Sequence, residues 1–498
     1  MVPSLRNYLC ESSVLYLLID ALRHGIRHEM LHTLHMMAPG AFANDTYNMI
    51  TTLNPYDQSV VGEFQTLDTA ALNAKIELAG QTFQKWKRTT FAERRERMLA
   101  ASSVLVQNKE RYARTIAIEM GKVLPEAVAE VEKSAAACKF FAEHAEEYLK
   151  DILIQTEARK SLVSFHPTGA ILAVMPWNFP FWQVIRFAAP ALMAGNVGLL
   201  KHASSVTTCS LMLEEVFKEA GFPEGAFQSL VIESKSVESV LASDIVQGVA
   251  LTGSEEAGGK VASIAGRHIK KSVLELGGSD PFVVLKDADV ELAVKIATQS
   301  RMQNAGQSCI SAKRFIVVKE IHDDFVHQFA ESIRKIKQGN PLDSSTNMGP
   351  VARIDLAETL EKQLRQSLKA GAKLEAGGDR DGNNFQPTLV DQVVPGMAAF
   401  DEETFGPLAA VVVARDEAHA ISLANLSRFG LGASVWTTDR DRGEQVARQI
   451  ESGSVFVNAL MKSDQRLPFG GVKKSGYGRE LSETGIKEFV NAKTISVS

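Results

Sequence analysis

Between Asp68, a suitable helix cap, and Lys150, the hydrophobic positions recur with the period of an α-helix. Apolar residues fall three or four positions apart in two stretches of this region. The first stretch comprises Leu72, Ile76, Ala79, Phe83 and Trp86, and the second Val131, Ala135, Cys138, Ala142, Ala145 and Leu149. This spacing predicts amphipathic helices with one buried face, and it makes Cys138 a core thiol.

After Ser161 short apolar runs replace this pattern and alternate with helix-like stretches. Strand-like runs occur at 171–175, 197–200, 227–232, 245–251, 272–276, 281–285 and 314–318. Helical stretches lie at 181–195, 204–220, 289–303 and 321–337. Strands that alternate with helices predict βαβ units and parallel sheets. We therefore expect two α/β units in series, each with its own sheet.

Residues 1–48 differ from the rest of the chain. The apolar run 14–22 has the length of a signal-peptide core, but Asp20 interrupts it and no small-residue cleavage site follows. Four histidines follow at spacings that would share one helix face: His24, His28, His32 and His35. A metal-binding stripe is one interpretation of them, and an extension without metal is the one we favour. Three methionines are alternative start sites: Met36, Met37 and Met49.

The composition is that of an ordinary globular protein. Of 498 residues 45% are hydrophobic and 23% are charged, with a formal net charge of −5. This balance indicates neither nucleic acid nor an anionic membrane as a partner, and no apolar run reaches the about 18–20 residues that cross a bilayer. The four cysteines lack metal-ligand spacing, so we expect no metal site and a reducing, cytoplasmic location.

Two segments place a polar side chain where a strand ends. Asn178 lies in the proline-flanked turn 176–180, at the strand end where open α/β sheets bind ligands; a plain turn is the alternative. Glu275 ends an apolar strand before two glycines, so burial would raise its pKa and suit it as a general base. The alternative for Glu275 is an ion pair with Lys270 or Lys271.

A third segment carries the candidate nucleophile. Cys309 follows Gly306 on a loop, and its thiolate would attack a carbonyl once activated; a small core hydrophobe is the alternative. Seven motifs that include these three segments occur in the order 176–180, Lys201, 251–254, 275–278, 306–309, 402–407 and 468–471. Together they resemble the aldehyde dehydrogenase superfamily, from about Asn54 to the end of the chain.

The resemblance implies an α/β fold with two Rossmann-type domains and a small β oligomerisation arm. Residues 49–150 and 165–276, with part of 467–483, would form the cofactor-binding domain, and 277–466 the catalytic domain. Residues 151–164 and 484–498 would form the arm, and 1–48 an extension outside the fold. The tail 494–498 alternates as an exposed strand does, and the family's arm implies a homodimer or homotetramer.

The resemblance also assigns catalytic roles. Cys309 would attack the aldehyde carbon to give a thiohemiacetal, and hydride loss to a nicotinamide would leave a thioester. Asn178 and the backbone N–H of Cys309 would hold the oxyanion, a donor whose loss costs about 3–4 kcal/mol of barrier. Glu275 would activate the water that hydrolyses the thioester.

For the cofactor, Gly253 and Ser254 stand where a strand passes into a helix, and the free N–H groups of a helix start suit a pyrophosphate. By resemblance Trp177 lies along the pyrophosphate and Lys201 reaches the adenine ribose. Glu403 would bind the nicotinamide ribose, and Phe405 would pack near the ring.

One departure from the family bears on the choice of cofactor. Members that prefer NAD carry a glutamate three residues after the lysine, whereas this chain has Ser204. A serine removes the negative charge that repels a 2′-phosphate, and Lys201 adds a cation. We therefore expect NADP to be preferred, with NAD possible.

Arg186 bears on the choice of aldehyde. It lies on the apolar stretch 181–195, and a buried arginine needs an anion, either a substrate carboxylate or a structural partner. An arginine here resembles the succinate-semialdehyde dehydrogenases, especially their shorter bacterial branch, so we expect oxidation of succinate semialdehyde to succinate. Another semialdehyde such as glutarate semialdehyde, an uncharged aldehyde, and a binding protein on this scaffold are the alternatives.

Some enzymes of that group have a second cysteine two residues after the nucleophile, which closes a regulatory disulfide. Here that position is Ser311, so we expect no such switch. An acylating, coenzyme A-dependent reaction is disfavoured because such members tend to lack the residue that stands here as Glu275.

Overall fold

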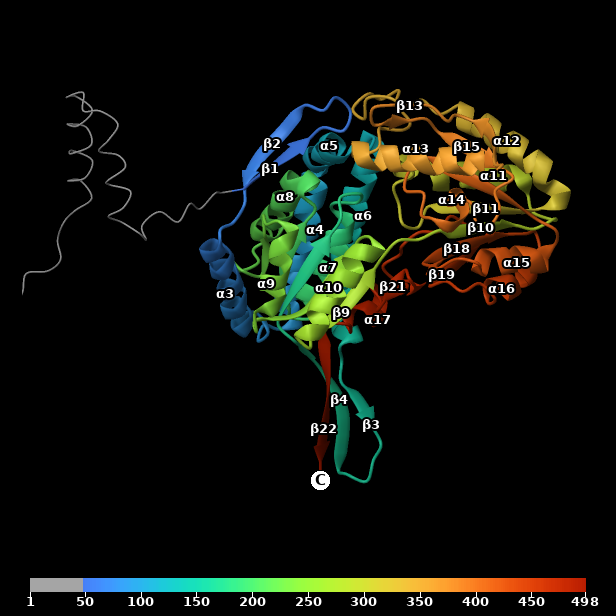
Figure 1. The fold of residues 1–498 in the computed structure, drawn as a ribbon. Coiled ribbons are helices and arrows are strands. Elements are labelled where there is room, and N and C mark those ends of the chain that lie inside the picture. Colours follow the sequence, from blue (N-terminus) through green and yellow to red (C-terminus); the bar gives the residue numbers. More distant parts are fainter. Residues whose placement is uncertain (1–47) are drawn as a thin grey trace, which may run out of the picture. The chain divides into compact units, whose positions relative to one another are not determined.

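A computed structural model of the protein describes residues 48–498. The predictions made for the amino-terminal region, namely the interrupted apolar run, the histidine stripe, the start sites and the extension, fall almost entirely on residues outside this range. Two large sheets carry the fold, and a third, smaller sheet forms an arm (Figure 1).

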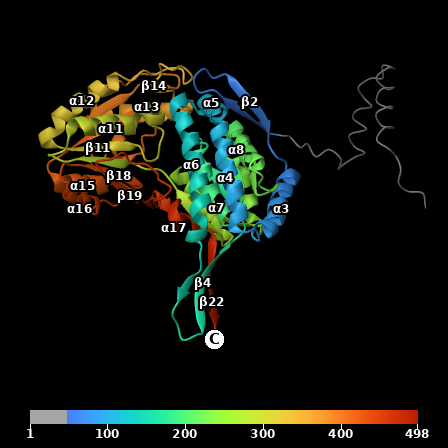
Figure 2. The ribbon, with the colours of Figure 1, turned by 180° about the vertical axis from the view of Figure 1, so that it is seen from behind.

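The first helices have the buried faces that the sequence predicts. They are α3 (Thr69–Trp86), α4 (Phe91–Gln107), α5 (Lys109–Met120) and α6 (Leu124–Tyr148). Asp68 caps α3 by accepting a hydrogen bond from the Ala71 N–H at 2.7 Å. All five predicted face positions of α3 are buried, and Cys138 lies fully buried on α6. Helices α4, α6 and α7 (Trp182–Met193) pack side by side (Figure 2).

The first large sheet has six strands in the order β21-β9-β8-β5-β6-β7. They are β5 (Ala170–Met175), β6 (Val197–His202), β7 (Phe227–Ser229), β8 (Val246–Thr252), β9 (Lys271–Glu275) and β21 (Gly476–Tyr477). Its helices include α8 (Thr207–Glu219), α9 (Val237–Ala242) and α10 (Glu255–Arg267). Strand β5 pairs with β6 on one side and β8 on the other, all parallel. The strand order reverses at β5, and open α/β sheets bind ligands at the carboxyl ends beside such a reversal.

The second large sheet has seven strands in the order β12-β15-β16-β11-β10-β18-β19. They are β10 (Asp280–Val284), β11 (Ala312–Val318), β12 (Lys373–Ala376), β15 (Thr388–Asp391), β16 (Leu408–Ala414), β18 (Gly432–Trp436) and β19 (Ser454–Val457). Its helices are α11 (Val290–Met302), α12 (His322–Arg334), α13 (Ile354–Lys369), α14 (Ala398–Asp401), α15 (Glu417–Asn425) and α16 (Arg440–Ala447). Phe282 and Val284 pack into the core on one face, and Val283 and Leu285 into the core on the other.

The arm is a three-stranded antiparallel sheet of β3 (Ile152–Ile154), β4 (Lys160–Pro167) and β22 (Val490–Val497). It extends away from the first large sheet in both ribbon views (Figures 1 and 2). Within the chain β22 pairs along the whole of β4, from Val490 opposite Pro167 to Val497 opposite Lys160. Helix α17 (Ser482–Ile486) precedes it. Three two-stranded sheets complete the described sheets: β1 (Met49–Leu53) with β2 (Val60–Gln65), β13 (Arg380–Asp381) with β14 (Asn384–Phe385), and β17 (Phe429–Gly430) with β20 (Val472–Lys473).

Two predicted elements are partly wrong. The helix predicted over 204–220 begins as a 3-10 turn, Ser204–Val206, and becomes α8 only at Thr207, because the Val206 backbone (φ −129°, ψ 43°) is not helical. The strand predicted over 227–232 ends at Ser229. The alternation of strands and helices and the two separate sheets are confirmed. The domain boundaries stay a prediction.

Candidate active site

The loop that carries Cys309 has an unusual backbone. Between α11 and β11 three consecutive residues, Asn304, Ala305 and Gly306, have positive φ values of 55°, 52° and 71°. A Cβ on Gly306 would lie 2.3 Å from the Gly406 carbonyl oxygen, so this position requires glycine. The loop therefore packs closely against the segment that contains Glu403 and Phe405.

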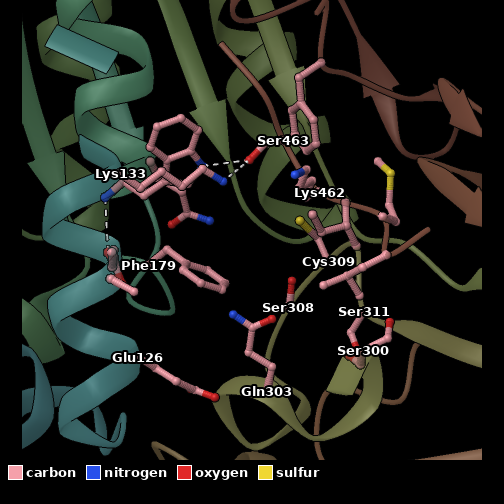
Figure 3. Close-up of a pocket in the computed structure, with 18 of the residues that line it drawn as sticks. Glu126, Lys133, Phe179, Ser300, Gln303, Ser308, Cys309, Ser311, Lys462 and Ser463 are labelled. Atoms are coloured by element: carbon pink, nitrogen blue, oxygen red, sulfur yellow. Dashed lines mark hydrogen bonds between the residues drawn. The ribbon is translucent and has the colours of Figure 1, made fainter. Parts of the chain in front are cut away.

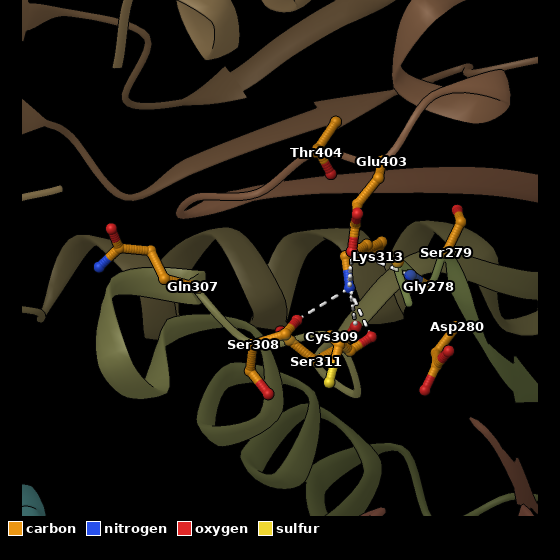
Figure 4. Close-up of polar contacts among 12 residues, drawn as sticks. Gly278, Ser279, Asp280, Gln307, Ser308, Cys309, Ser311, Lys313, Glu403 and Thr404 are labelled. Atoms are coloured by element: carbon orange, nitrogen blue, oxygen red, sulfur yellow. Dashed lines mark hydrogen bonds and ion pairs between the residues drawn. The ribbon is translucent and has the colours of Figure 1, made fainter. Parts of the chain in front are cut away.

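Two buried cations hold this loop, and the sequence analysis identified neither. The Arg301 guanidinium donates to the carbonyl oxygens of Ala312 (3.1 Å), Gly306 (2.5 Å), Thr404 (3.3 Å) and Gly406. The Lys313 ammonium donates to the carbonyl oxygens of Ser308 (2.9 Å), Cys309 (2.9 Å) and Ser311 (3.1 Å), and it lies 3.6 Å from the Glu403 carboxylate (Figure 4). Lys313 therefore joins the nucleophile loop to the side chain predicted to bind the nicotinamide ribose.

Asn178 lies against the same loop. One hydrogen of its side-chain amide goes to the Gln307 carbonyl oxygen at 3.0 Å, and its Oδ1 accepts from Gln183 at 3.1 Å. An amide group has two hydrogens, so a second donor remains for the site. The Asn178 carbonyl accepts from Lys122 (3.0 Å) and from the Asn304 side chain (2.9 Å), which fixes the turn to the loop.

Glu130 supports this turn from helix α6, although the sequence analysis did not single it out. It forms a buried ion pair with Lys122, and its other oxygen accepts from the backbone N–H groups of Phe181 (2.9 Å) and Trp182 (3.1 Å). A carboxylate at a helix start satisfies N–H groups that have no partner within the helix. Glu130 thereby anchors the beginning of α7 directly after Asn178.

Glu275 ends β9 and is only 2% exposed. Neither carboxyl oxygen has a hydrogen-bond partner among residues 48–498. Burial raises the pKa of Glu275 well above its usual value, and the neighbouring Glu480 raises it further. The alternative of an ion pair with Lys270 or Lys271 is wrong, because Lys270 donates to the Leu241 carbonyl at 2.6 Å and Lys271 pairs with Glu488 at 2.7 Å.

The structure brings Cys309 close to the segment that begins with Glu275. A Cβ on Gly278 would lie 2.5 Å from the Cys309 carbonyl oxygen, so the two loops touch. Burial raises the pKa of the Cys309 thiol to about 12, while the charges of Arg186 and Lys313 oppose this rise. The resting thiol is therefore protonated, and attack on a carbonyl needs a base that takes its proton.

Cys309 opens onto a cavity of about 260 Å³ (Figure 3). Helices α6 and α7, the nucleophile loop and residues 460–463 contribute most of the lining. The charged lining residues are three cations, Lys133, Arg186 and Lys462, and two carboxyl groups, Glu126 and Glu130, of which Glu130 is paired with Lys122. A site of this kind suits a small substrate that carries negative charge.

Arg186 is 2% exposed and has an anionic partner within the chain. Its guanidinium forms an ion pair with Glu480, donates to the Thr252 hydroxyl at 3.1 Å and lies 4.7 Å from the centre of the Phe469 ring. Glu480 is therefore the structural partner that was one of the two alternatives for Arg186 in the sequence analysis. Its binding of a substrate carboxylate stays a prediction.

The residues predicted to bind a dinucleotide gather at the carboxyl ends of neighbouring strands. Trp177 follows β5, Lys201 and Ser204 lie at and after the end of β6, and Gly253 and Ser254 follow β8. Ser254 caps α10 by accepting from the Ala257 N–H at 3.2 Å. The Trp177 and Phe405 rings are in edge contact, with centres 5.8 Å apart.

These residues fit a dinucleotide. Lys201 is 7% exposed, and its ammonium forms no hydrogen bond with any residue of 48–498, so it is free to donate to a ligand. Helix α10 directs its first N–H groups toward the same edge of the sheet. Glu403 accepts from the Gly278 N–H at 2.9 Å and from its place beside Lys313 can accept ribose hydroxyls.

Comparison with known proteins identifies the family. The family profile described as "Aldehyde dehydrogenase family" matches residues 42–495. The chain belongs to the aldehyde dehydrogenase family. This confirms the resemblance and the fold class inferred from the motifs.

Several members of the aldehyde dehydrogenase family are close relatives. A probable succinate-semialdehyde dehydrogenase [NADP(+)] of Synechocystis sp. is 49% identical over 452 residues, which are 90% of this chain and 100% of the relative. A succinate-semialdehyde dehydrogenase [NADP(+)] of Mycobacterium avium is 45% identical over 453 residues, covering 90% of this chain and 96% of the relative. The crystal structure of succinic semialdehyde dehydrogenase from Streptococcus pyogenes in complex with NADP+ matches with a TM-score of 0.88 at 35% identity, covering 90% and 99% of the two chains.

Residues 48–498 include no cluster of three or more histidine, cysteine, aspartate or glutamate side chains arranged to hold a metal ion. No helix in this range is both long and apolar enough to cross a membrane.

Proposed function

We propose that this aldehyde dehydrogenase oxidises succinate semialdehyde to succinate with NADP+ as electron acceptor. One observation carries the proposal: the predicted nucleophile, Cys309, opens onto a cavity that has three cations in its lining. A semialdehyde has a carbonyl group at one end and a carboxylate at the other, so one end suits the thiol and the other the cations. The relatives named above carry the same activity in their names.

The choice of NADP+ is supported at the end of β6. Ser204 places no negative charge beside the predicted adenine ribose, and Lys201 supplies an unpaired ammonium there. A 2′-phosphate is dianionic or nearly so, and it binds where cations and hydroxyl donors replace carboxylates. The structural relative from Streptococcus pyogenes was solved in complex with NADP+.

In the first chemical step the sulfur of Cys309 forms a bond to the aldehyde carbon, and the carbonyl oxygen becomes an oxyanion. The second amide hydrogen of Asn178 and the backbone N–H of Cys309, which donates to no residue of 48–498, would stabilise that charge. The thiol proton must leave before attack, and Glu275, whose charge acts on the thiol, is the base we propose for this step. Turning out of its buried position toward the cavity would lower its pKa, because the carboxylate would gain water and hydrogen bonds.

Bound NADP+ supplies the acceptor for the hydride that leaves the thiohemiacetal. Glu403 and Lys313 would fix the ribose next to the nucleophile loop, and Phe405 would limit the movement of the ring. After Glu275 has released the thiol proton to solvent, it would take a proton from the water that attacks the thioester, and passing this proton to the departing sulfur as the carbon–sulfur bond breaks would release the acid and restore the thiol.

The activity is tested by following NADPH formation with succinate semialdehyde, glutarate semialdehyde and butanal, an uncharged aldehyde of the same chain length. We expect the highest kcat/KM with succinate semialdehyde and no NADPH formation in the Cys309→Ala variant. A Cys309→Ala variant that keeps full activity would refute the covalent mechanism. A higher kcat/KM with butanal or glutarate semialdehyde would replace the proposed substrate.

A Ser204→Glu variant tests the cofactor proposal. The new carboxylate would repel a 2′-phosphate, and like charges in contact cost several kcal/mol, so kcat/KM for NADP+ should fall by about 100-fold while that for NAD+ rises. Ser103→Glu, the same change on the exposed side of α4, is the matched control and should alter neither value. Unchanged cofactor preference in Ser204→Glu would contradict the assignment.

We further propose that the arm mediates formation of a homodimer or homotetramer and that the enzyme is cytoplasmic. The arm exposes apolar side chains on its outer strand β3, where Leu153 is 71% exposed. Exposed apolar strands of this kind are covered in stable oligomers. The three cysteines of the described residues, Cys138, Cys209 and Cys309, are free thiols, which suits a reducing compartment.

A further inference from the structure

We propose that His202 is a positioning residue that couples the predicted NADP+ site to the predicted oxyanion donor. The inference rests on the proposed function, since it uses the roles proposed there for Asn178, Lys201 and Ser204. His202 is the last residue of β6 and directly follows Lys201, and its side chain reaches the turn that carries Asn178. The sequence analysis assigned no role to this histidine.

The imidazole ring of His202 lies between three pieces of backbone. Its Nε2 is 3.0 Å from the carbonyl oxygen of Pro180, the last residue of the turn 176–180. Its Nδ1 is 3.0 Å from the backbone nitrogen of Ala203 and 3.2 Å from the carbonyl oxygen of Met175, which ends β5. One side chain therefore contacts the end of β5, the turn that follows it and the end of β6.

These contacts determine the tautomer of the ring. A neutral imidazole has one N–H donor and one acceptor nitrogen. Nε2 faces a carbonyl oxygen, so it carries the hydrogen and donates to Pro180, while Nδ1 accepts from the Ala203 N–H. His202 is 5% exposed, and its burial, with a smaller contribution from the charge of Lys201, lowers the pKa of the ring to about 4, although the two carbonyl oxygens oppose this. The ring is therefore neutral near neutral pH and makes both hydrogen bonds at once.

The Pro180 carbonyl depends on the imidazole. The N–H groups of Gln183 and Ile185 donate to the carbonyl oxygens of Phe179 and Phe181, on either side of Pro180. Pro180 is buried, and no second hydrogen bond to its oxygen is present among residues 48–498. A buried carbonyl without a donor is costly, so loss of the imidazole would favour a movement of the turn toward another donor.

The two hydrogen bonds act on the two halves of the reaction site. The bond from Nε2 holds the turn in which Asn178 lies, and the second amide hydrogen of Asn178 is the proposed oxyanion donor. The bond to Nδ1 holds the backbone of Ala203, which lies between the proposed cofactor contacts Lys201 and Ser204. A misplacement of about 1 Å at a reacting group costs about 100-fold in rate. One ring thereby links the geometry of the cofactor site to the direction of the oxyanion donor.

Two amide substitutions separate the two hydrogen bonds. In His202→Asn the side-chain oxygen takes the place of Nδ1 and can accept from Ala203, whereas in His202→Gln the side-chain nitrogen takes the place of Nε2 and can donate to Pro180. We expect His202→Leu, which keeps neither bond, to lower kcat with succinate semialdehyde by about 10-fold and to raise the KM for NADP+ by about 10-fold. His202→Asn should restore mainly the KM, and His202→Gln mainly kcat.

His268→Gln is the matched control, because His268 is exposed after the end of α10 and both kinetic constants should keep their wild-type values. Wild-type kcat and KM in His202→Leu, or identical kinetic constants in His202→Asn and His202→Gln, would overturn the inference and leave the proposed function standing. A wild-type enzyme that forms no NADPH from succinate semialdehyde would instead refute the proposed function. Thermal unfolding identifies loss of fold in His202→Leu, in which case the comparison of His202→Asn with His202→Gln decides the question.

Discussion

At the scale of single residues, buried charge controls the position of the nucleophile. Lys313 contacts three carbonyl oxygens of the Cys309 loop and lies beside Glu403, so one side chain links the thiol to the predicted cofactor contact. Its positive charge also opposes the rise in the pKa of the Cys309 thiol. Lys313 is a positioning residue by this geometry.

Replacing Lys313 with methionine should weaken both the positioning of the Cys309 loop and the electrostatic effect on the Cys309 thiol. The loop would lose three hydrogen bonds, the Cys309 pKa would rise further, and kcat would fall by about 100-fold, as expected when a positioning group is lost. Alkylation of Cys309 by iodoacetamide at a fixed pH should become slower, a readout that packing alone would not change. Lys319→Met, at an exposed position after the same strand, is the control. Alkylation at the wild-type rate in Lys313→Met would contradict this role.

Several of these residues could not be found from the sequence. Lys313 lies one residue before the predicted strand 314–318, and Lys133 and Ser463 approach each other only when α6 packs beside the segment after β19. The motifs identified Asn178, Glu275 and Cys309 because unusual neighbours surround each of them. A lysine on an amphipathic helix has no such signature, since most lysines at such positions face solvent.

At the scale of elements, the loop from α11 to β11 depends on its glycine. Gly306 has a φ of 71°, and the Gly406 carbonyl occupies the space of a side chain. The period of hydrophobic residues predicts the helix before this loop and the strand after it. The three left-handed residues between them follow from contacts with Arg301 and the 402–407 segment, which no local pattern contains.

A Gly306→Ala variant should be less stable and inactive. The left-handed backbone alone costs an alanine about 1 kcal/mol, and the clash with Gly406 must displace one of the two loops. Gly259→Ala on α10 is the control, because no atom lies within 4 Å of the added Cβ and alanine favours a helix. We expect a lower melting temperature and no NADPH formation in Gly306→Ala only. Full activity in that variant would show that the loop tolerates another conformation.

At the scale of the whole described chain, the two sheets and the arm were predictable and the contacts between distant segments were not. Apolar runs that alternate with helical stretches predict the two sheets, and the alternation of apolar and polar residues in the tail 494–498 predicts an exposed strand. The pairing of β21 with β9 places residue 476 opposite Glu275, and Phe469 and Glu480 lie against Arg186. These contacts join residues about 200 or more positions apart, beyond any periodic pattern.

Removing residues 490–498 should separate the subunits. Strand β4 would lose its partner along eight paired positions, and the arm would retain only the short pairing of β4 with β3. We expect a smaller mass by light scattering and a lower melting temperature. Removing Ser498 alone, which lies beyond β22, is the control. An unchanged mass after the longer truncation would show that the arm does not mediate assembly.

The late segment 469–497 has a consequence for synthesis of the enzyme. The second large sheet and all of the first except β21 are translated before this segment, which supplies β21 beside Glu275, the partner of Arg186 and one strand of the arm. A nascent chain can therefore bury most of its core while its thiol still lacks the surroundings for catalysis. Oxidation of aldehydes begins only after translation has passed this point, and the same would hold for the proposed association through the arm, so prematurely terminated products would contribute to neither.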